Sequence, residues 1–470
     1  MSEHQNPAVE VPLGRVVLVA ATAALGGFLF GFDTAVINGA VGAIGERFEA
    51  SGFLLGFAVA SALIGCAVGA WYAGPVADRL GRIRVMIIAA ALFVISSIGC
   101  GAAFSIWDLS LWRAVGGLGV GAASIIAPAY IAEVSPAGIR GRLGSLQQLA
   151  IVTGIFVALL TAYALVAAAG SATDPLFGIE AWRLMFLAEL VPAIVYGVLA
   201  FTIPESPRFL ISRGQRQKAL KVLNRYVGGD AEQTADEIEK SFRGRSERPR
   251  LSILRGPSGR VYPIVWAGLG LAVLQQFTGI NVIFYYSSVL WQAVGFTEQD
   301  SLIITVITSV TNILTTVVAI LLIDKVGRKP LLLIGSIGQF ASLAVLAITF
   351  ATAPVVGGEP VLEGAASPIA LVAANLFVVF FGCTWGPIMW VMLGEMFPNK
   401  IRVMALAVAG AAQWAANFAV STTFPALSEI GLGLAYGVYT AFAFISIFFV
   451  LRFIKETKGE TLEALSERDG

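Results

Sequence analysis

Uncharged amide side chains recur inside strongly apolar stretches of this chain, where an amide is costly to bury unless it finds a hydrogen-bond partner. A neutral polyol donates and accepts hydrogen bonds through its hydroxyl groups and has apolar C–H faces, so amides beside an aromatic platform would suit it. Gln276 and Asn281 are five residues apart with Gly279 between them, which indicates a locally irregular helix whose polar face lines a cavity. Trp390 follows a Gly-Pro pair, where a broken helix would present an indole. The amides are Gln148, Gln275, Gln276, Asn281, Asn312 and Gln413, and the alternative for any single one is an ordinary interhelical hydrogen bond.

Two opposite charges, Asp33 and Arg113, also lie inside apolar stretches, where a charge is expensive enough to indicate function. Both fall in the outer half of their stretches, so we expect them to meet at one depth and form an ion pair. Small-xxx-small patterns at 27–31 and 117–121 favour close approach of the two helices that carry them. Such a pair can bind and release a proton as it breaks and re-forms. The alternative is a static ion pair that only stabilises the fold.

The composition places these groups in a membrane protein with many spans. Of 470 residues, 57% are hydrophobic and 13% are charged, and the mean hydropathy is +0.82, which leaves too few polar side chains to cover a soluble surface. The one histidine is His4 and the three cysteines lie in apolar runs, so no group has metal-ligand spacing and no catalytic triad is expected. There is no GxxxxGKS/T phosphate loop. We therefore expect no metal, no cofactor, no nucleic-acid partner and no enzyme activity.

Twelve apolar segments are long enough to span a bilayer, which takes about 20 residues. Gly and Ala are spread throughout and no alternating barrel pattern occurs, so we predict an all-α membrane protein with twelve transmembrane helices. Of 31 Lys and Arg residues, 28 fall on one side, and the positive-inside rule places both termini and the long central segment in the cytoplasm. The expected spans are residues 16–37, 53–73, 85–104, 109–131, 143–168, 183–203, 262–291, 302–323, 331–351, 368–393, 403–424 and 434–453.

Two short motifs occur twice and divide the chain into halves. An Asp-x-x-Gly-Arg motif lies at 78–82 and 324–328, and a Glu followed by Pro at +3 and Arg at +7 lies at 133–140 and 395–402. Each half has an even number of spans, so both keep the same orientation in the membrane. We expect a six-helix bundle at 1–203, a cytoplasmic linker with short helices at 204–261, a second six-helix bundle at 262–454 and a cytoplasmic tail at 455–470.

Carboxylates accompany the bases at these repeated motifs, all at the cytoplasmic ends of the spans. We expect salt bridges between the halves there, which hold the cytoplasmic side closed in one state and break when the halves rock. The alternative is positive-inside anchoring with solvated ion pairs, each worth little energy. The residues assigned to this cytoplasmic gate are Asp78, Arg82, Glu133, Arg140, Glu205, Arg208, Asp324, Arg328, Glu395 and Arg402.

Four further motifs carry a family resemblance: PESPR at 204–208, QQFTGIN at 275–281, WGPIMW at 385–390 and ETKG at 456–459. With the Gly-Arg loops, they resemble the sugar porter branch of the major facilitator superfamily, which contains bacterial proton-coupled xylose and glucose symporters and the animal glucose facilitators. The resemblance implies the major facilitator fold. It also implies that the amides and Trp390 contact sugar and that Glu189 lies near the cytoplasmic gate. At the position of Asp33, proton symporters of the family carry Asp, as this chain does, whereas facilitators more often carry Asn. The sugar site would be completed by Phe30, Tyr285, Gly386 and Trp414.

The resulting prediction is a proton-coupled symporter that imports a monosaccharide by alternating access. Glucose is the first choice, with xylose and galactose close behind, and the alternatives are an uncoupled facilitator or a transporter-like sugar sensor. The expected partners are a sugar, protons and the lipid bilayer, and the carrier is expected to work as a monomer. The lack of an Asn-x-Ser/Thr sequon, the short loops, and 23 Arg against 8 Lys favour the inner membrane of a bacterium.

Overall fold

Long apolar helices account for most of the chain, because backbone groups in a bilayer must be satisfied within each spanning segment. The computed structural model describes residues 13–136, 140–228, 230–243, 251–256, 259–356, 359–398 and 401–457. Within these residues, twelve helical stretches are long and apolar enough to cross a membrane, which confirms the predicted number. The first runs over residues 13–47 where the apolar pattern predicted 16–37, because a helix continues past the hydrocarbon layer that the pattern detects.

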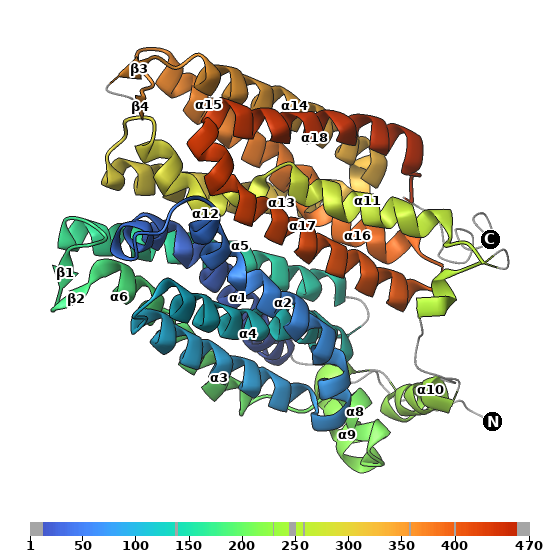
Figure 1. Cartoon of the computed structure of the whole chain (residues 1–470). Helices are drawn as coiled ribbons and strands as arrows, with labels where there is room; N and C mark the ends of the chain where they lie inside the picture. The colour runs from blue at the N-terminus through green and yellow to red at the C-terminus, as the bar shows by residue number, and fades with distance from the viewer. Residues whose placement is uncertain are drawn as a thin grey trace, which may run out of the picture.

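The first half contains six spans and a short hairpin before the last of them (Figure 1). Its sixth span is interrupted at Glu189, three residues before Pro192, which cannot donate a backbone hydrogen bond. The elements are α1 (Leu13–Arg47), α2 (Gly52–Leu80), α3 (Arg82–Gly101), α4 (Ile106–Val134), α5 (Arg140–Ala169), β1 (Pro175–Leu176), β2 (Ile179–Glu180), α6 (Ala181–Ala188) and α7 (Leu190–Ala200).

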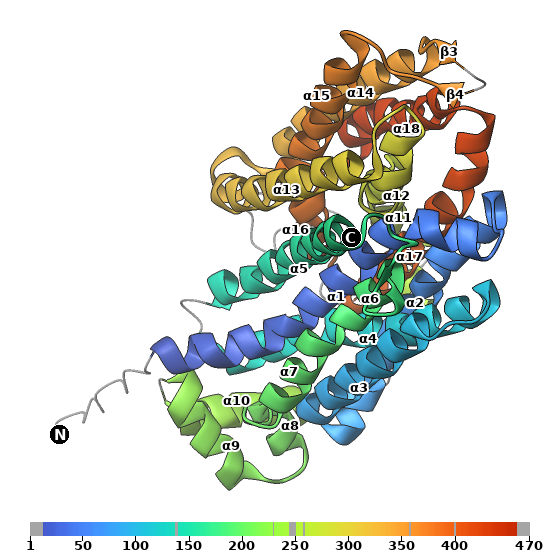
Figure 2. The ribbon, with the colours of Figure 1, turned by 90° about the vertical axis from the view of Figure 1, so that its left-hand side faces the viewer.

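The linker forms short helices beside the end of the first half (Figure 2). Its helices share a small apolar core that includes Leu210, Ala219 and Ala235. Arg213 donates hydrogen bonds to the backbone carbonyls of Asp78 (3.5 Å) and Arg79, and so caps the end of α2. The elements are α8 (Pro207–Ser212), α9 (Arg216–Val222), the π-helical turn η2 (Leu223–Val227), α10 (Ala231–Arg243) and the 3₁₀ turn η3 (Leu251–Leu254).

The second half repeats the six spans, with breaks in its first and fourth. The first span breaks between α11 and α12 at Gly279, and the fourth contains the π-helical turn η4. The elements are α11 (Pro263–Phe277), α12 (Ile280–Gln292), α13 (Glu298–Val326), α14 (Arg328–Ala351), β3 (Val355–Val356), β4 (Glu359–Pro360), α15 (Ala366–Phe380), η4 (Phe381–Trp385), α16 (Gly386–Met396), α17 (Arg402–Ile430) and α18 (Leu432–Phe453).

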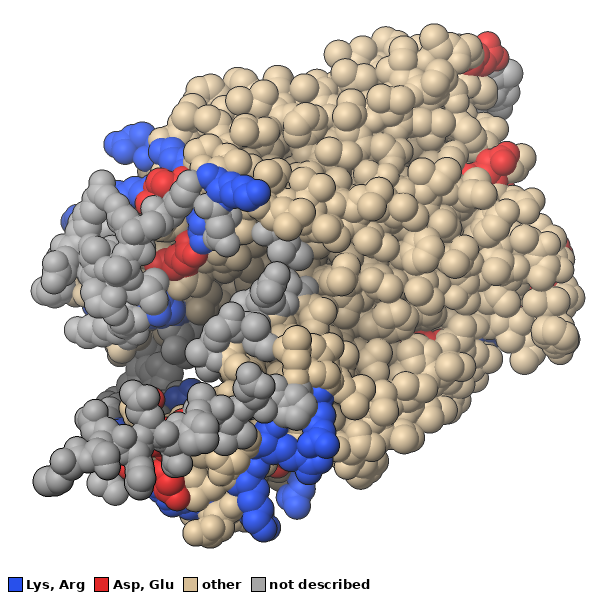
Figure 3. Space-filling view, turned by 180° about the vertical axis from the view of Figure 1, so that it is seen from behind, with Lys and Arg blue, Asp and Glu red and all other residues tan. Residues whose placement is uncertain are grey.

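The two ends of the bundle differ in character. One end carries the hairpins β1–β2 and β3–β4 and is called the hairpin end; the other carries the linker and most Lys and Arg (Figure 3) and is called the basic end. At the hairpin end one continuous apolar core joins both halves, including Phe32 and Trp182 from the first and Tyr286 and Phe377 from the second. Toward the basic end, separate cores lie mainly within each half. The halves therefore pack most closely at the hairpin end.

Three helix pairs cross between the halves: α2 with α17, α5 with α13 and α1 with α12. Glycine lets several helices approach closely. Helices α1 and α4 meet as predicted, but the small-residue patterns at 27–31 and 117–121 face other helices. A Cβ at Gly117 would collide with the Ala62 carbonyl of α2, and one at Gly31 with the Ile151 carbonyl of α5. The spacing of glycines fixes which residues share a helix face, not which neighbour that face meets.

Candidate functional site

The predicted ion pair forms in the interior of the first half, between α1 and α4. Arg113 Nη1 lies 3.2 Å from Asp33 Oδ1 and 2.7 Å from the backbone carbonyl oxygen of the same residue, and both side chains are 2% exposed. Gly116 leaves the space for it, since a Cβ there would lie 3.0 Å from Asp33 Oδ1. Asp33 Oδ2 and Arg113 Nε have no hydrogen-bond partner among the described residues. The pair is buried yet incompletely satisfied, which is the condition under which a change of protonation matters most.

Glu189 lies beside this ion pair and not at the basic end, so its predicted place in the cytoplasmic gate is wrong. It interrupts the span Ala181–Ala200 near its middle and is 1% exposed. Ser97 of α3 donates a hydrogen bond to Glu189 Oε2 (3.0 Å), and Glu189 Oε1 has no partner among the described groups. Phe186, one turn earlier, places its ring 6.0 Å from Arg113 Cζ. The resemblance supplied the residue, but the depth of position 189 within its span already argued against the gate.

Four of the predicted amides form one hydrogen-bonded chain in the second half. Gln413 Nε2 and Gln276 Nε2 both donate to Gln275 Oε1, at 2.8 and 3.1 Å. Asn281 Nδ2 donates to Gln276 Oε1 at 2.6 Å. Gln275 Nε2 donates to the carbonyl oxygens of Trp385 (2.9 Å) and Gly386 (3.3 Å). The chain therefore extends from α11, α12 and α17 to the end of η4 and the start of α16. Each amide keeps further donors or acceptors that a polyol can use.

The chain of amides depends on the break in the seventh span, which confirms the predicted irregular helix. Gly279 has φ 81°, a left-handed conformation that favours glycine, and a Cβ there would lie 2.7 Å from the Tyr439 ring. This turn re-aims the helix so that Gln276 and Asn281 can meet across it. In a regular helix, residues five apart do not share a face.

The aromatic residues divide between the proposed site and the core. The Phe30 and Trp414 rings lie 6.0 Å apart, one from each half. Trp390 of α16 is 45% exposed and free to face a ligand, whereas Trp385 is fully buried and donates to the Leu332 carbonyl (3.0 Å) and Ser336 Oγ (3.1 Å). Only the second tryptophan of the WGPIMW motif therefore suits the predicted platform.

The other predicted residues of this group lie on neighbouring helices without joining the amide chain. Gln148 of α5 is half-buried, and Asn312 of α13 is 8% exposed. Tyr285 of α12 is buried, and Asn417 of α17 is buried four residues after Gln413. Asn417 was missed from the sequence although it satisfies the same criterion, an amide inside a span.

At the basic end of the first half, charged residues tie three segments together. Arg82 forms a two-bond fork with Glu133, Nε to Oε2 and Nη2 to Oε1, both at 3.1 Å, and lies 3.5 Å from Asp78. Glu205 accepts from the backbone N–H groups of Arg82 (3.0 Å) and Ile83 (3.3 Å), where a carboxylate suits the start of α3. The Ser206 hydroxyl donates to Glu133.

The second half builds the same arrangement from repeat-related residues. Arg328 forms a fork with Glu395 at 3.1 and 2.8 Å. Glu456 accepts from the backbone N–H groups of Arg328 and Lys329, both at 3.0 Å, and Thr457 Oγ1 donates to Glu395 at 2.6 Å. The pair Glu456 and Thr457 thus takes the place of Glu205 and Ser206. Their role was missed, although the ETKG motif was noted.

The Arg82–Glu133 and Arg328–Glu395 ion pairs each lie within one half. They are therefore not the salt bridges between the halves that the sequence predicted. The two forks belong to separate halves at the end where the apolar cores are also separate. Arg402 donates to the Phe397 carbonyl at 3.0 Å and Arg208 lies in the first turn of α8. The side chains of Arg140 and Asp324 lie outside the described residues.

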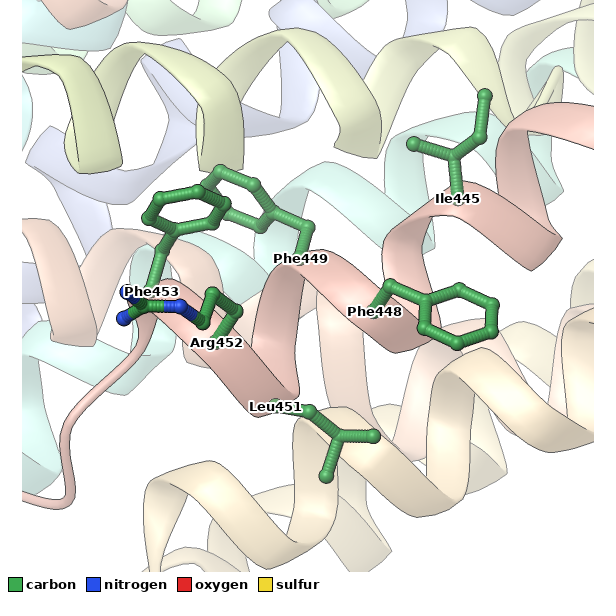
Figure 4. Close-up of a pocket in the computed structure, with 6 residues that line it drawn as sticks. All are labelled: Ile445, Phe448, Phe449, Leu451, Arg452 and Phe453. Atoms are coloured by element: carbon green, nitrogen blue, oxygen red, sulfur yellow. The ribbon is translucent and has the colours of Figure 1, made fainter.

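A surface groove of about 560 Å³ lies along α18 near the basic end (Figure 4). Phe448, Phe449 and Phe453 line it, and Arg452 is the polar side chain among its six lining residues. Its walls cannot pair with the many hydroxyl groups of a polyol, so it is not the sugar site.

The fold and this division of polar groups define a twelve-span carrier of the major facilitator type, and comparison with known proteins agrees. The family model described as "Sugar (and other) transporter" matches residues 19–468. The chain is 60% identical over 453 residues to the glucose transport protein of Synechocystis sp., covering 96% of this chain and 97% of the relative. It is 37% identical over 487 residues to the D-xylose-proton symporter of Escherichia coli K12, covering 95% and 94%.

Solved structures agree with these sequence matches. The inward-open conformation of the xylose transporter XylE from E. coli superposes with a TM-score of 0.82 at 35% identity, covering 97% of this chain and 100% of that one. The chain belongs to the sugar transporter family, whose members are carriers and not enzymes.

Proposed function

We propose that this protein is a proton-coupled symporter that imports a monosaccharide, with glucose as the first choice, by alternating access. The observation that carries the proposal is the buried ion pair of one half beside the chain of neutral amides in the other. The relatives named as a glucose transport protein and a D-xylose-proton symporter support a sugar and a proton as the transported species.

The basic end faces the cytoplasm in this proposal, because it carries the linker and the sequence assigns 28 of the 31 Lys and Arg residues to the side of the membrane on which the linker lies. Both termini then lie in the cytoplasm, and the membrane is the inner membrane of a bacterium. The six-helix halves correspond to residues 1–203 and 262–454, joined by the linker at 204–261, and the carrier works as a monomer.

Sugar binds between the halves, where amide groups and exposed aromatic faces can satisfy its hydroxyl groups and its apolar C–H faces together. Gln276 and Asn281 exchange their mutual hydrogen bond for bonds to the ligand, and the Trp390 indole covers its ring. The residues proposed to bind sugar are Gln148, Gln275, Gln276, Asn281, Asn312, Trp390, Gln413, Phe30, Tyr285, Gly386 and Trp414.

A proton entering from the hairpin end is taken up by Asp33 and removes the charge that attracts Arg113. The weakened pair favours conversion of the loaded carrier to the state open at the basic end, where the proton leaves and the pair re-forms. Glu189 is buried, and the ring of Phe186, one turn earlier, lies 6.0 Å from Arg113 Cζ, so we include Glu189 in this site. The clusters around Arg82 and Arg328 hold the basic ends of their halves in shape during this movement.

Uptake of labelled glucose into proteoliposomes tests the proposal. Wild type should accumulate glucose only with an inward-directed proton gradient, whereas Asp33→Asn should exchange glucose without accumulating it. Asp300→Asn, at an exposed carboxylate in the first turn of α13, is the matched control and should accumulate normally. Accumulation by wild type that persists after the gradient is collapsed would rule out symport.

An uncoupled facilitator is the second candidate, because one hydrogen bond of Arg113 does not depend on the charge of Asp33. Arg113 also donates to the Asp33 backbone carbonyl, and protonation of the carboxylate does not remove that contact. In that case the ion pair is a fixed part of the fold, and wild type and Asp33→Asn would both equilibrate glucose without concentrating it.

A further inference from the structure

The side chain of Asn38 ties the two halves together at a buried point. Asn38 Nδ2, on α1, donates to the Phe284 carbonyl (3.0 Å) and to Ser287 Oγ (2.9 Å) of α12. Asn38 Oδ1 accepts from the Ser288 backbone N–H (3.2 Å), and the Ser288 hydroxyl donates to the Asn38 carbonyl. Four hydrogen bonds therefore cross between the halves through one residue, and the group Asn38, Ser287 and Ser288 is called the clasp.

The clasp is shut off from solvent. Asn38 is 0% exposed, and Ser287 and Ser288 are 2% and 3% exposed. Ser287 is held from the other side by Thr305 of α13, whose hydroxyl lies 2.6 Å from Ser287 Oγ. A buried amide that loses its partners without gaining water is strongly penalised. The clasp can therefore open only together with entry of water between α1 and α12.

Its position links the two candidate sites. On α1, Asn38 follows Asp33 by five residues, about 7.5 Å toward the hairpin end. On α12, Ser287 follows Asn281 by six residues, about 9 Å in the same direction. The clasp thus joins the helix that carries the ion pair to the helix that carries the end of the amide chain.

A second contact crosses the halves farther out but is less enclosed. Both carboxylate oxygens of Glu298, at the start of α13, accept from the Ala172 backbone N–H, at 3.2 and 3.3 Å. Glu298 is half-buried beside exposed residues at the start of α13, where water can replace these bonds at little cost. The clasp is the deeper of the two contacts and lies within the apolar core that spans both halves.

We propose that Asn38 is a positioning residue that closes the hairpin end, and that its hydrogen bonds to α12 set the balance between the two access states. The inference rests on the proposed alternating access but on neither the sugar nor the proton. Removing the amide weakens only the state in which α1 and α12 meet, so the carrier shifts toward the state open at the hairpin end.

The test is a distance measurement on the full chain in lipid nanodiscs, without sugar and at one fixed pH. Spin labels replace Phe177 of the β1–β2 turn, which is 91% exposed, and Glu363, which is exposed in the second half. Asn38→Ala should raise the long-distance population about fivefold or more, as expected for lost hydrogen bonds in one state. Ser288→Ala should shift it in the same direction.

The matched control is Asn375→Ala, because that amide bonds Thr311 (3.4 Å) and the Leu371 carbonyl (3.0 Å) within one half. It should leave the distances unchanged. Thermal melting of each variant shows whether it folds. If Asn38→Ala does not fold, Ser288→Ala replaces it in the distance measurement. Distances in folded Asn38→Ala or Ser288→Ala that equal those of Asn375→Ala would overturn the clasp. The proposed symport is tested separately by gradient-driven uptake. A failure of wild type in that assay would count against symport but not against the clasp, because the distances are measured without sugar and without a gradient.

Discussion

The two halves are built alike at their basic ends and differ in the middle of the membrane. At the basic ends, an Arg-Glu fork and a capping carboxylate recur with nearly the same bond lengths. In the interior, the first half holds the ionisable residues Asp33, Arg113 and Glu189, whereas the second holds a chain of neutral amides. A proton requires a group that changes charge, and a polyol requires groups that donate and accept without charge. The repeat thus keeps the ion pairs at the basic ends and differs in the interior, where we propose that the first half binds the proton and the second half binds the sugar.

The largest effect should come from breaking the ion pair on one side only. Arg113→Leu leaves Asp33 as a buried charge without its partner, which costs about 3–5 kcal/mol. We expect a large drop in the thermal midpoint of unfolding in detergent. The double variant Asp33→Asn with Arg113→Leu should recover most of it. If the single and double variants melt alike, the pair is not an energetic unit.

A change to the amide chain should weaken sugar binding and spare proton coupling. Gln276→Ala removes bonds to Gln275 and Asn281 as well as to ligand, so we expect glucose affinity to fall about 10- to 100-fold. Isothermal titration calorimetry measures this loss. Gln339→Ala is the control, because that amide is fully buried on α14 and has no hydrogen-bond partner among the described residues, so the glucose affinity of this variant should stay close to wild type. Unchanged binding by Gln276→Ala would show that the amides are structural.

The shared basic ends predict matching effects of repeat-related variants. Arg82→Ala and Arg328→Ala each remove a partly exposed fork, so initial uptake rates should fall by about threefold to tenfold, as expected for charge-assisted hydrogen bonds. The informative result is the ratio between the two variants, which should stay within about twofold. A strong effect in one half alone would show that the two clusters do different work.

The smallest effect should come from the linker, which belongs to neither half. Arg216 is hydrogen-bonded to Glu232 (2.6 Å), Asp236 (2.7 Å) and Glu239 (2.8 Å), and these bonds raise its pKa above the usual value. Arg216 therefore stays charged across the physiological range, and the cluster lies on the surface. Arg216→Ala should therefore leave initial uptake within about twofold of wild type.

The sequence alone predicted the number of spans, the repeat, the irregular helix at Gly279 and the ion pair, because depth and spacing determine them. It did not predict which neighbour each glycine face meets, and so the packing of Gly31 and Gly117 was misassigned. Glu189 was misplaced because its role came from a resemblance and not from its depth. The structural roles of Asn38 and Glu456 required knowing which distant segments pack together, which spacing along one helix does not contain.

The carboxylates of Glu205 and Glu456, which cap α3 and α14, bear on whether the protein can assemble from two separate polypeptides. Gly81 and Gly327 have φ 97° and 107°, and a Cβ at Gly81 would collide with Glu205, as one at Gly327 would approach Glu456 Oε2 to 2.8 Å. Each loop glycine is thus matched to an acid more than a hundred residues away, and each matched set lies within or directly beside one half. Because each loop meets its acid within or beside one half, two separately expressed polypeptides divided inside the linker should reassemble, whereas a graft of either loop without its acid should be less stable.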